Sequence, residues 1–182
     1  MESTNFPDKE QLPVHTRWMI RRDMPEVLNI EGESFEFPWL EEDFLSHLKN
    51  RNRIGMVAEY DNRVAGYAVY ELHKTRLHLL NFAVSGDYRR TGVGTQMVNK
   101  LTGKLSFQRR SKILLEVRER NLTAQLFFRE NGFRAVGILH DYYTETSEDA
   151  YLMEYQFRSC LQKPVEESKG YFSKLLNFLR AG

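Results

Sequence analysis

The stretch DYRRTGVGTQM, from Asp87 to Met97, sets two arginines ahead of two glycines spaced Gly92-x-Gly94. Glycines in this arrangement let the backbone pack closely against a ligand or another segment. Arginines beside them favour an anionic ligand, because a guanidinium donates charge-assisted hydrogen bonds. The residues that follow are apolar at helical spacing, which predicts a helix starting at the glycines. These apolar residues are Val93, Met97, Leu101 and Leu105.

Three interpretations of this turn compete. A P-loop requires Gly-Lys-Ser/Thr, whereas Thr95 and Gln96 follow Gly94 here. A dinucleotide-binding fingerprint requires a third glycine, whereas Met97 stands at that position. The fingerprint must also follow a strand directly, whereas SGDYRR separates the predicted strand from the glycines here. The third interpretation is a plain glycine-containing turn with solvated arginines. The predicted helix start favours anion binding, because its first turn has unpaired N–H groups and the positive end of the helix dipole.

The composition describes an ordinary globular chain. Its 182 residues suffice for one domain with its own core. Lys and Arg (26) nearly balance Asp and Glu (25), so no global field indicates a nucleic-acid binder. The single cysteine, Cys160, excludes an internal disulfide. No apolar run approaches the roughly 20 residues that span a bilayer, and the N-terminus is unlike a secretory signal. We expect a cytoplasmic protein without nucleic-acid or membrane partners.

The apolar pattern predicts strands and helices in alternation after a flexible leader at 1–13. A short strand within 15–23 precedes a helix over 23–35, with Asp23 as its N-cap and Pro25 in its first turn. FEFPW (35–39) interrupts the helix, which resumes over 40–51. The later segments are strands at 54–60, 64–72, 77–84 and 112–117, a helix at 121–132, and strands at 133–139 and 150–157. This order predicts an α/β or α+β domain with a mixed sheet.

The chain resembles a known family. RRTGVG (89–94) fits the Arg/Gln-x-x-Gly-x-Gly/Ala pattern of the GNAT superfamily of acetyl-CoA-dependent N-acetyltransferases. The resemblance runs from about Ile20 to Phe157, and with FPW at 37–39 it is most similar to bacterial ribosomal-protein alanine N-acetyltransferases and their archaeal relatives. It implies one GNAT-type domain over 14–158, with a mostly antiparallel sheet flanked by helices on both faces. The other matching segments are FAV (82–84), LEVRERN (115–121), FFRENGF (127–133) and DYYTETSEDAYLM (141–153).

The resemblance implies that the anion is the pyrophosphate of coenzyme A, with acetyl-CoA as cosubstrate and no metal. A splayed strand would free an N–H group for the oxyanion, which is worth roughly 3 kcal/mol per donor. Asn121 would bind the pantetheine, cap a helix, or do both. The implied coenzyme-binding residues are Phe82, Ala83, Val84, Arg89, Arg90, Thr91, Gly92, Val93, Gly94, Asn121 and Phe128.

Glu116 is the candidate general base, because acyl transfer requires a neutral amine. It lies in an apolar strand and shares a face with Leu114 and Arg118. An ion pair with Arg118 or another basic neighbour is the structural alternative, whereas the resemblance implies a base that acts through water. An α-amino group has a pKa of about 7.7–8.0, against about 10.4 for lysine, so a modest base suffices for a peptide N-terminus.

The general acid is absent from its usual position. Related enzymes carry a tyrosine twelve residues after the glutamate, where this chain has Phe128. Tyr142 or Tyr143 could donate the proton instead, with strand alternation placing one of the pair on the active-site face. Water could serve, or the thiolate could leave unaided, since a thiol of pKa about 8.5 is a tolerable leaving group. Loss of catalysis is the fourth alternative.

The resemblance places the acceptor between the FEFPW turn and the HDYYTETSED hairpin. Phe37, Trp39, Tyr142 and Tyr143 would wall this slot, unless they serve in peripheral packing. The N-terminal α-amine of a protein, such as a ribosomal protein beginning with alanine, is the expected acceptor. Other N-termini, a lysine side chain, a small amine, and a non-catalytic acetyl-CoA-binding module stay open.

The C-terminal extension, 159–182, predicts an amphipathic helix. Its apolar residues recur at helical spacing with Lys174 and Arg180 nearby, so the helix would fold back on the domain or dock on a membrane or partner. These apolar residues are Phe172, Leu175, Leu176 and Leu179.

Overall fold

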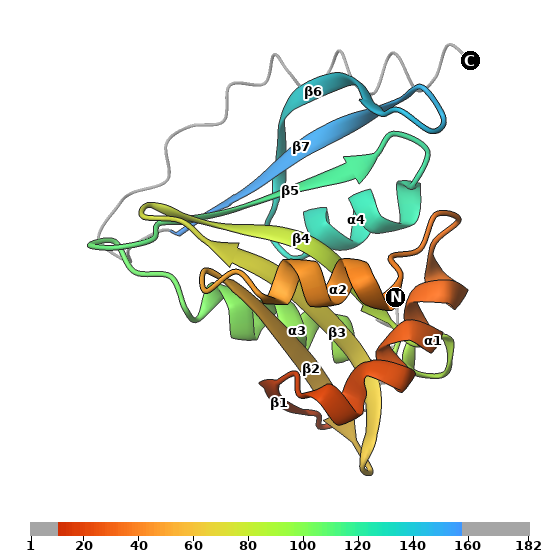
Figure 1. Ribbon diagram of the computed structural model, residues 1–182. Helices are drawn as coiled ribbons and strands as arrows, with labels where there is room; N and C mark the ends of the chain where they lie inside the picture. The colour runs from red at the N-terminus through yellow and green to blue at the C-terminus, as the bar shows by residue number, and fades with distance from the viewer. Residues whose placement is uncertain (1–10, 158–182) are drawn as a thin grey trace, which may run out of the picture.

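A single sheet organises the computed structural model, which describes residues 11–157 (Figure 1). Its seven strands follow the order β1-β2-β3-β4-β5-β7-β6. All neighbours are antiparallel except β4 and β5, which run parallel. The prediction of a mixed, mostly antiparallel sheet is therefore confirmed. The predicted C-terminal amphipathic helix lies outside the described residues, as does most of the predicted leader.

The strands are β1 (His15–Trp18), β2 (Arg53–Tyr60), β3 (Arg63–Leu72), β4 (Arg76–Val84), β5 (Lys112–Arg118), β6 (Arg134–Tyr143) and β7 (Glu148–Gln156). The helices are α1 (Met24–Ser34), α2 (Glu41–Leu48), α3 (Val93–Thr102) and α4 (Leu122–Glu130), with 3-10 turns η1 (Arg21–Asp23) and η2 (Gly86–Tyr88). Within residues 11–157, no helix has the length and apolar character that crossing a bilayer requires.

Side-chain alternation along the central strands builds a core on each face of the sheet. On β3, Tyr67 and Val69 pack with residues of α1 and α2, whereas Ala68 and Tyr70 pack with residues of α3 and α4. Figure 1 shows α1 and α2 on the near face and α3 on the far face. Fully burying one large apolar side chain stabilises a fold by about 1.5–3 kcal/mol, so both faces hold their helices firmly. The predicted helices on both faces are confirmed.

Two local predictions need correction. Asp23 stands at the N-cap of α1, but its side chain makes no capping hydrogen bond. Its carboxylate instead accepts from the Arg17 guanidinium at 2.6 and 2.9 Å and from the N–H of Ile20 at 2.9 Å. The bonds to the guanidinium are charge-assisted, so they are stronger than a capping bond to an N–H of α1. The sequence of the second helix also puts Leu40, Phe44, Leu45 and Leu48 on one face, which predicts that all four pack inward. In the structure Leu40 and Leu45 are exposed, and Phe44 is the fully buried residue of the four.

The strands β4 and β5 separate part-way along their length. They pair only from Arg76 opposite Lys112 to His78 opposite Leu114. Just beyond, Leu80 is an extra residue on β4, because Val69 pairs with Asn81 and Tyr70 with Leu79. Such a bulge bends its strand and increases the local twist. A wedge therefore opens between residues 79–84 of β4 and residues 115–118 of β5.

Candidate active site

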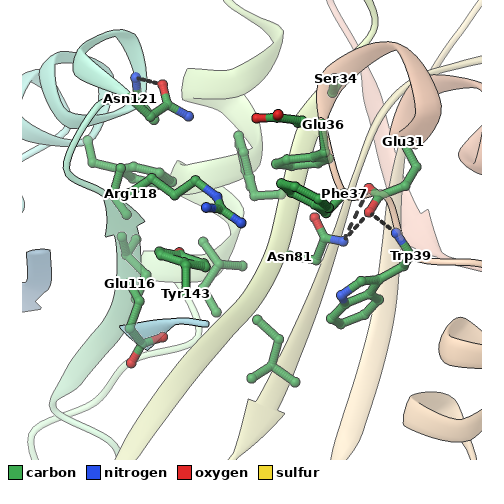
Figure 2. A pocket seen from close by; sticks show the side chains of 18 residues that line it. Glu31, Ser34, Glu36, Phe37, Trp39, Asn81, Glu116, Arg118, Asn121 and Tyr143 are labelled. Atoms are coloured by element: carbon green, nitrogen blue, oxygen red, sulfur yellow. Dashed lines mark hydrogen bonds between the residues drawn. The ribbon is translucent and has the colours of Figure 1, made fainter. Parts of the chain in front are cut away.

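A pocket of about 350 Å³ fills this wedge (Figure 2). Residues 79–82 and 115–118 form its two strand walls. The loop between α1 and α2 closes one side, and α4 closes another with Asn121, Ala124 and Phe128. Tyr143, at the end of β6, completes the rim. Segments far apart in the sequence thus meet here because the sheet opens at this point.

Glu116 lies in the pocket wall and has a histidine as its partner. Its carboxylate oxygens lie 2.7 and 3.0 Å from Nε2 of His78, on the facing strand β4. Because an ionised carboxylate only accepts, Nε2 carries the hydrogen in this contact. Both side chains are partly exposed, so a proton held by the pair can reach water. As predicted, Leu114, Glu116 and Arg118 share one face of β5, while the residues between them are buried.

Arg118 is not the partner of Glu116. Its Nη1 donates to Thr146 Oγ1 at 2.9 Å and to the buried carboxylate of Glu148 at 3.1 Å. Its guanidinium lies 3.8 Å from the ring centroid of Tyr143 and 5.5 Å from that of Phe37. Burial raises the pKa of Glu148, but the N–H of Arg120 and the Arg118 guanidinium lower it by more. Arg118 therefore bridges the α1–α2 loop and the β6–β7 hairpin as half of an ion pair.

Of the two candidate tyrosines, Tyr143 borders the pocket and Tyr142 does not. The Tyr142 ring is 47% exposed and stands nearly perpendicular to the Tyr143 ring, at 5.0 Å. Asp141, which precedes both tyrosines, has a φ of 49° at an irregularity in the pairing of β6 with β7. Burial, followed by the nearby Tyr142, raises the pKa of Tyr143 to about 12 despite Arg118. Its phenol therefore stays protonated throughout the physiological range.

Phe128, at the position where related enzymes have tyrosine, is only 6% exposed. Its ring lies 5.6 Å from Phe82, 5.1 Å from Phe127 and 5.2 Å from Phe133, each in an edge-to-face arrangement. Aromatic rings favour this geometry. This part of the pocket is an apolar wall without a hydroxyl.

The predicted acceptor wall is formed by the loop between α1 and α2. Trp39 lines the pocket and stacks on His47 at 4.2 Å, with Phe44 against its edge at 5.3 Å. Phe37 is more exposed and lies beside Arg118 at the rim. Trp39 therefore combines the two predicted roles, because one ring both packs on α2 and borders the pocket.

The backbone N–H groups of residues 90–95, around Gly92, form a concave group of hydrogen-bond donors that we call the cradle. Gly92 has a φ of 84° and precedes the first residue of α3. Within residues 11–157, no acceptor takes a hydrogen bond from the N–H groups of residues 90–95. Consecutive free N–H groups at a helix N-terminus make a site for an anion. This geometry favours the anion-binding interpretation over a plain turn.

The two glycines serve the cradle differently from what the sequence suggested. A Cβ on Gly92 would lie 2.9 Å from the Gln11 side chain, and one on Gly94 would lie 3.0 Å from the Phe127 ring. Both glycines therefore allow close packing against protein, rather than leaving open space for a phosphate. Gly92 in addition supplies the left-handed backbone conformation that begins the helix.

Arg89 has a supporting position in the cradle. Its Nε donates to the carbonyl of Val84 at 3.0 Å and its Nη2 to Ser34 Oγ at 3.0 Å. This side chain thus ties the end of β4 to α1. Arg90 is exposed, with a φ of 66°, and has no such contact among residues 11–157. Of the two arginines, Arg90 is the one whose guanidinium is available to a ligand.

Part of the predicted flexible leader is held beside the cradle. Gln96 Nε2 donates to the carbonyl of Leu12 at 2.6 Å, and Gln96 Oε1 accepts from the N–H of Val14 at 3.3 Å. The N–H of Leu12 also donates to the carbonyl of Thr91 at 3.1 Å. Hydrogen bonds at Leu12 and Val14 therefore hold the end of the predicted leader against the start of α3.

Asn121 occupies the position that the sequence allowed for two roles. Its Oδ1 accepts from the N–H of Ala124 at 3.0 Å, which caps α4, and the residue also lines the pocket. Among residues 11–157, no acceptor takes a hydrogen bond from its amide NH2. Within residues 11–157, no group of three or more His, Cys, Asp and Glu side chains is placed to hold a metal ion.

Sequence reasoning missed two titratable residues here: His78, the partner of the pocket residue Glu116, and Glu31, which lines the pocket. His78 carried no motif, because its contact with Glu116 depends on the pairing of β4 with β5. Glu31 lies four residues after Val27 and directly after Ile30, so it belongs to the face of α1 that these two core residues form. Like them, it is buried. A carboxylate on the apolar face of a helix was a signal that the sequence did contain.

Comparisons with known proteins agree with this geometry. The model of the Acetyltransferase (GNAT) family matches residues 24–133, more than half of the chain. The [Ribosomal protein bS18]-alanine N-acetyltransferase of Escherichia coli (strain K12) is 30% identical over 133 residues, covering 72% of this chain and 89% of that protein. The N-alpha-acetyltransferase of Sulfurisphaera tokodaii is 31% identical over 123 residues, covering 60% of this chain and 73% of that protein.

Solved structures share the fold. The crystal structure of the ribosomal-protein-S18-alanine N-acetyltransferase from Escherichia coli has a TM-score of 0.72 at 25% identity, covering 84% of this chain and 99% of that one. Ard1 from Thermoplasma volcanium has a TM-score of 0.73 at 26% identity, covering 80% of this chain and 99% of that one. The predicted resemblance is confirmed: this chain belongs to the GNAT family and is an N-acetyltransferase.

Proposed function

We propose that this enzyme transfers the acetyl group of acetyl-CoA to the N-terminal α-amine of a protein, with an N-terminal alanine of a ribosomal protein as the first candidate. The observation that carries the proposal is the Glu116–His78 pair, in which Glu116 lines the pocket and His78 stands at the last paired position of β4 with β5, where the wedge begins. The similarity to ribosomal-protein alanine N-acetyltransferases supports the choice of acceptor. We also propose that the reaction takes place in the cytoplasm, where ribosomal proteins are made.

Acetyl-CoA would bind along the wedge from the cradle to Glu116. The free N–H groups of residues 90–95, with the Arg90 guanidinium, suit a pyrophosphate. Residues 82–84 of β4 lie beyond the last β4–β5 pair, so their free edge can pair with the amides of the pantetheine arm. The NH2 of Asn121 and the apolar ring of Phe128 would contact the same arm.

Transfer would begin when Glu116 accepts a proton from the acceptor ammonium, directly or through one water. An α-ammonium with a pKa of about 7.7–8.0 gives up this proton readily near neutral pH. His78 holds the carboxylate in place and offers the proton a path to solvent. The neutral amine then attacks the thioester carbon, and an N–H of the freed β4 edge stabilises the oxyanion. As the C–S bond breaks, the nitrogen gives up its surplus proton to water through the Glu116–His78 pair, which leaves a neutral amide and the thiolate of coenzyme A.

Tyr143 is the candidate partner of the departing sulfur. A phenol of pKa about 12 is a poor proton donor to a thiolate whose thiol has a pKa of about 8.5, because full transfer is uphill by roughly 5 kcal/mol. A hydrogen bond from the phenol still stabilises the thiolate while it leaves. The thiolate then takes its proton from water. Tyr143 thus assists departure, and an acid at position 128 is not required.

The acceptor would enter between Phe37 and Trp39 on one side and Tyr143 on the other. The slot suits an extended peptide, because its rings are apolar and its rim carries Arg118 and Glu36. Tyr142 stands outside the pocket and would contact only residues further along the acceptor.

A peptide panel tests the proposal. Purified enzyme and acetyl-CoA are incubated with peptides that differ in their first residue, each with an internal lysine, and tandem mass spectrometry locates the acetyl group. We expect the α-amine to be acetylated, fastest with alanine first. Acetylation of the lysine alone would assign a lysine acetyltransferase. Absence of any product, with acetyl-CoA still bound, would indicate a non-catalytic binding module.

A further inference from the structure

The buried carboxylate of Glu31 lies beneath the acceptor side of the pocket and takes no part in the chemistry proposed above. Glu31 belongs to α1 and is only 1% exposed. A carboxylate buried this deeply is costly unless hydrogen bonds occupy its lone pairs. Burial raises its pKa, while the N–H of Trp39 and the amide of Asn81 lower it in part. The partners of this group therefore show what it holds in place.

Four hydrogen bonds converge on this carboxylate. Oε1 accepts from the N–H of Trp39 at 2.8 Å and from Asn81 Nδ2 at 3.1 Å. Oε2 accepts from Asn81 Nδ2 at 3.2 Å and from the hydroxyl of Tyr67. Figure 2 shows the contacts with Trp39 and Asn81 as dashed lines converging on Glu31. One carboxyl group thus joins the α1–α2 loop, β4 and β3.

The two groups joined by Glu31 belong to the two halves of the proposed site. Trp39 lines the acceptor side of the pocket. Asn81 follows the bulge residue Leu80 and directly precedes the free edge of β4 that would hold the thioester. Acyl transfer requires the amine and the thioester in a fixed arrangement, and a misplacement of about 1 Å can cost about a hundredfold in rate.

We propose that Glu31 is a positioning residue for acetyl transfer, whose buried carboxylate fixes the acceptor wall at Trp39 relative to the thioester strand at Asn81. The inference rests on the proposed function, which assigns the acceptor to the α1–α2 loop. The hydrogen bonds occupy both carboxylate oxygens, so Glu31 neither binds the acceptor nor takes its proton. It acts through the backbone of Trp39 and the side chain of Asn81.

The first test compares two substitutions on the same helix. Glu31→Gln puts an amide NH2 where a carboxylate oxygen accepted hydrogen bonds, so at least one buried donor loses its acceptor. We expect the acceptor KM to rise about tenfold, with the acetyl-CoA KM within about twofold of wild type. Glu26→Gln is the matched control, because Glu26 accepts from the N–H of Val64 at 2.9 Å, away from the pocket. It should leave both KM values unchanged.

A purely structural role for Glu31 predicts another pattern. The unfolding temperature of Glu31→Gln would fall, while the acceptor KM of the folded enzyme would stay within about twofold of wild type. That outcome overturns the proposal. Titration of active sites with acetyl-CoA corrects each variant for its folded fraction.

A compensating exchange sharpens the test. In the double variant Glu31→Gln, Asn81→Asp, the amide oxygen at 31 can accept from Trp39, and its NH2 can donate to the carboxylate at 81. Tyr67 can donate to the same carboxylate. We expect the acceptor KM to return to within about threefold of wild type, while Asn81→Asp alone raises it by placing two carboxylates together. Failure of the exchange to restore KM contradicts the proposed network.

A readout without catalysis separates this inference from the proposed function. The chain has two tryptophans, and Trp18 is 74% exposed on β1. In a Trp18→Phe background, the fluorescence anisotropy decay of Trp39 reports the motion of the acceptor wall. We expect faster decay with Glu31→Gln and no change with Glu26→Gln. An inactive wild type would reject the proposed function, whereas unchanged Trp39 motion in an active enzyme would reject the role of Glu31.

Discussion

Tyr143 and Phe128 both line the pocket and decide, in the proposed mechanism, which group could assist the leaving sulfur. Phe128 offers an apolar ring edge within an aromatic cluster. Tyr143 offers a phenol that stays protonated, since its pKa is about 12. In the proposed mechanism, Tyr143 therefore supplies the hydrogen-bond donor that position 128 lacks.

We expect Tyr143→Phe to lower kcat about fivefold, the value of one hydrogen bond of about 1 kcal/mol to the departing sulfur. Tyr142→Phe should change kcat by less than about twofold, because that ring stands outside the pocket. Steady-state kinetics at saturating acceptor measure both. If neither variant loses more than about threefold, roughly 0.7 kcal/mol, the sulfur leaves without help from either phenol.

The sequence predicted some residues of the site from their type and position, but it did not predict which residues they would contact. Glu116 stood out as a carboxylate in an apolar strand. His78 did not, because a sequence does not state which residues of β4 face β5. Likewise, the sequence does not distinguish two adjacent tyrosines in a strand, whereas the structure places Tyr143 at the pocket and Tyr142 outside it.

At the scale of a single element, the N–H groups of the cradle at the start of α3 depend on the conformation of Gly92. An alanine there would be held in a left-handed conformation, which costs about 1–2 kcal/mol, and its Cβ would press on Gln11. Both effects displace the N–H groups that would bind the pyrophosphate.

We expect Gly92→Ala to weaken acetyl-CoA binding about tenfold by calorimetry, following that conformational cost. Adding Gln11→Ala should recover part of the loss, because it removes the side chain that the new Cβ would meet. Gly86→Ala is the matched control on the same loop, since nothing lies within 4 Å of a Cβ there. Wild-type affinity in Gly92→Ala would show that the coenzyme binds elsewhere.

Elements with strong local signals were predicted well. The helix from Val93 and the three strands before it follow from apolar periodicity and from the turn at Asp61 and Asn62. The anchoring of residues 11–13 to Gln96 was not predictable, because it joins segments more than eighty residues apart by hydrogen bonds without an apolar pattern.

At the scale of the whole molecule, an ion-pair cluster fixes the edge of the sheet. Arg17 on β1 binds Asp23 at the start of α1 and Glu59 on β2. Burial raises the pKa of Asp23, but Arg17 and the N–H of Ile20 lower it by more, so the net shift is downward from 3.8. A lowered folded-state pKa gives stability that is present above pH 3.8 and is lost as the pH falls through the folded pKa.

We expect Asp23→Asn to destabilise the protein at pH 7 by about 1.5–3 kcal/mol, the value of a charged hydrogen bond. The difference from wild type should shrink as the pH falls below 3.8, where the wild-type carboxyl also loses its charge. Thermal unfolding at pH 7, 5 and 3 measures this trend. A difference that does not change with pH would mean that the Asp23 charge contributes nothing to the fold.

The fold class followed from the order of the elements, but the opening of the sheet did not. Alternating strands and helices predicted a mixed sheet, and the family resemblance implied helices on both of its faces. The wedge arises from one extra residue, Leu80, and from β4 and β5 pairing over a short stretch only. Nothing in the apolar pattern of β4 marks Leu80 as a bulge, so the feature that creates the site was visible only in three dimensions.

The most direct measurement follows acetyl transfer to one peptide in two forms. The peptide begins with alanine and carries one lysine, and its N-terminus is either free or blocked. With wild-type enzyme, we expect transfer to the free form and none to the blocked form. With Glu116→Gln, transfer should fall about a hundredfold at pH 7, and the deficit should shrink towards pH 9 as the amine deprotonates unaided. Equal transfer to both forms, or pH profiles that run parallel in the two enzymes, would contradict α-amine acetylation by the Glu116–His78 pair.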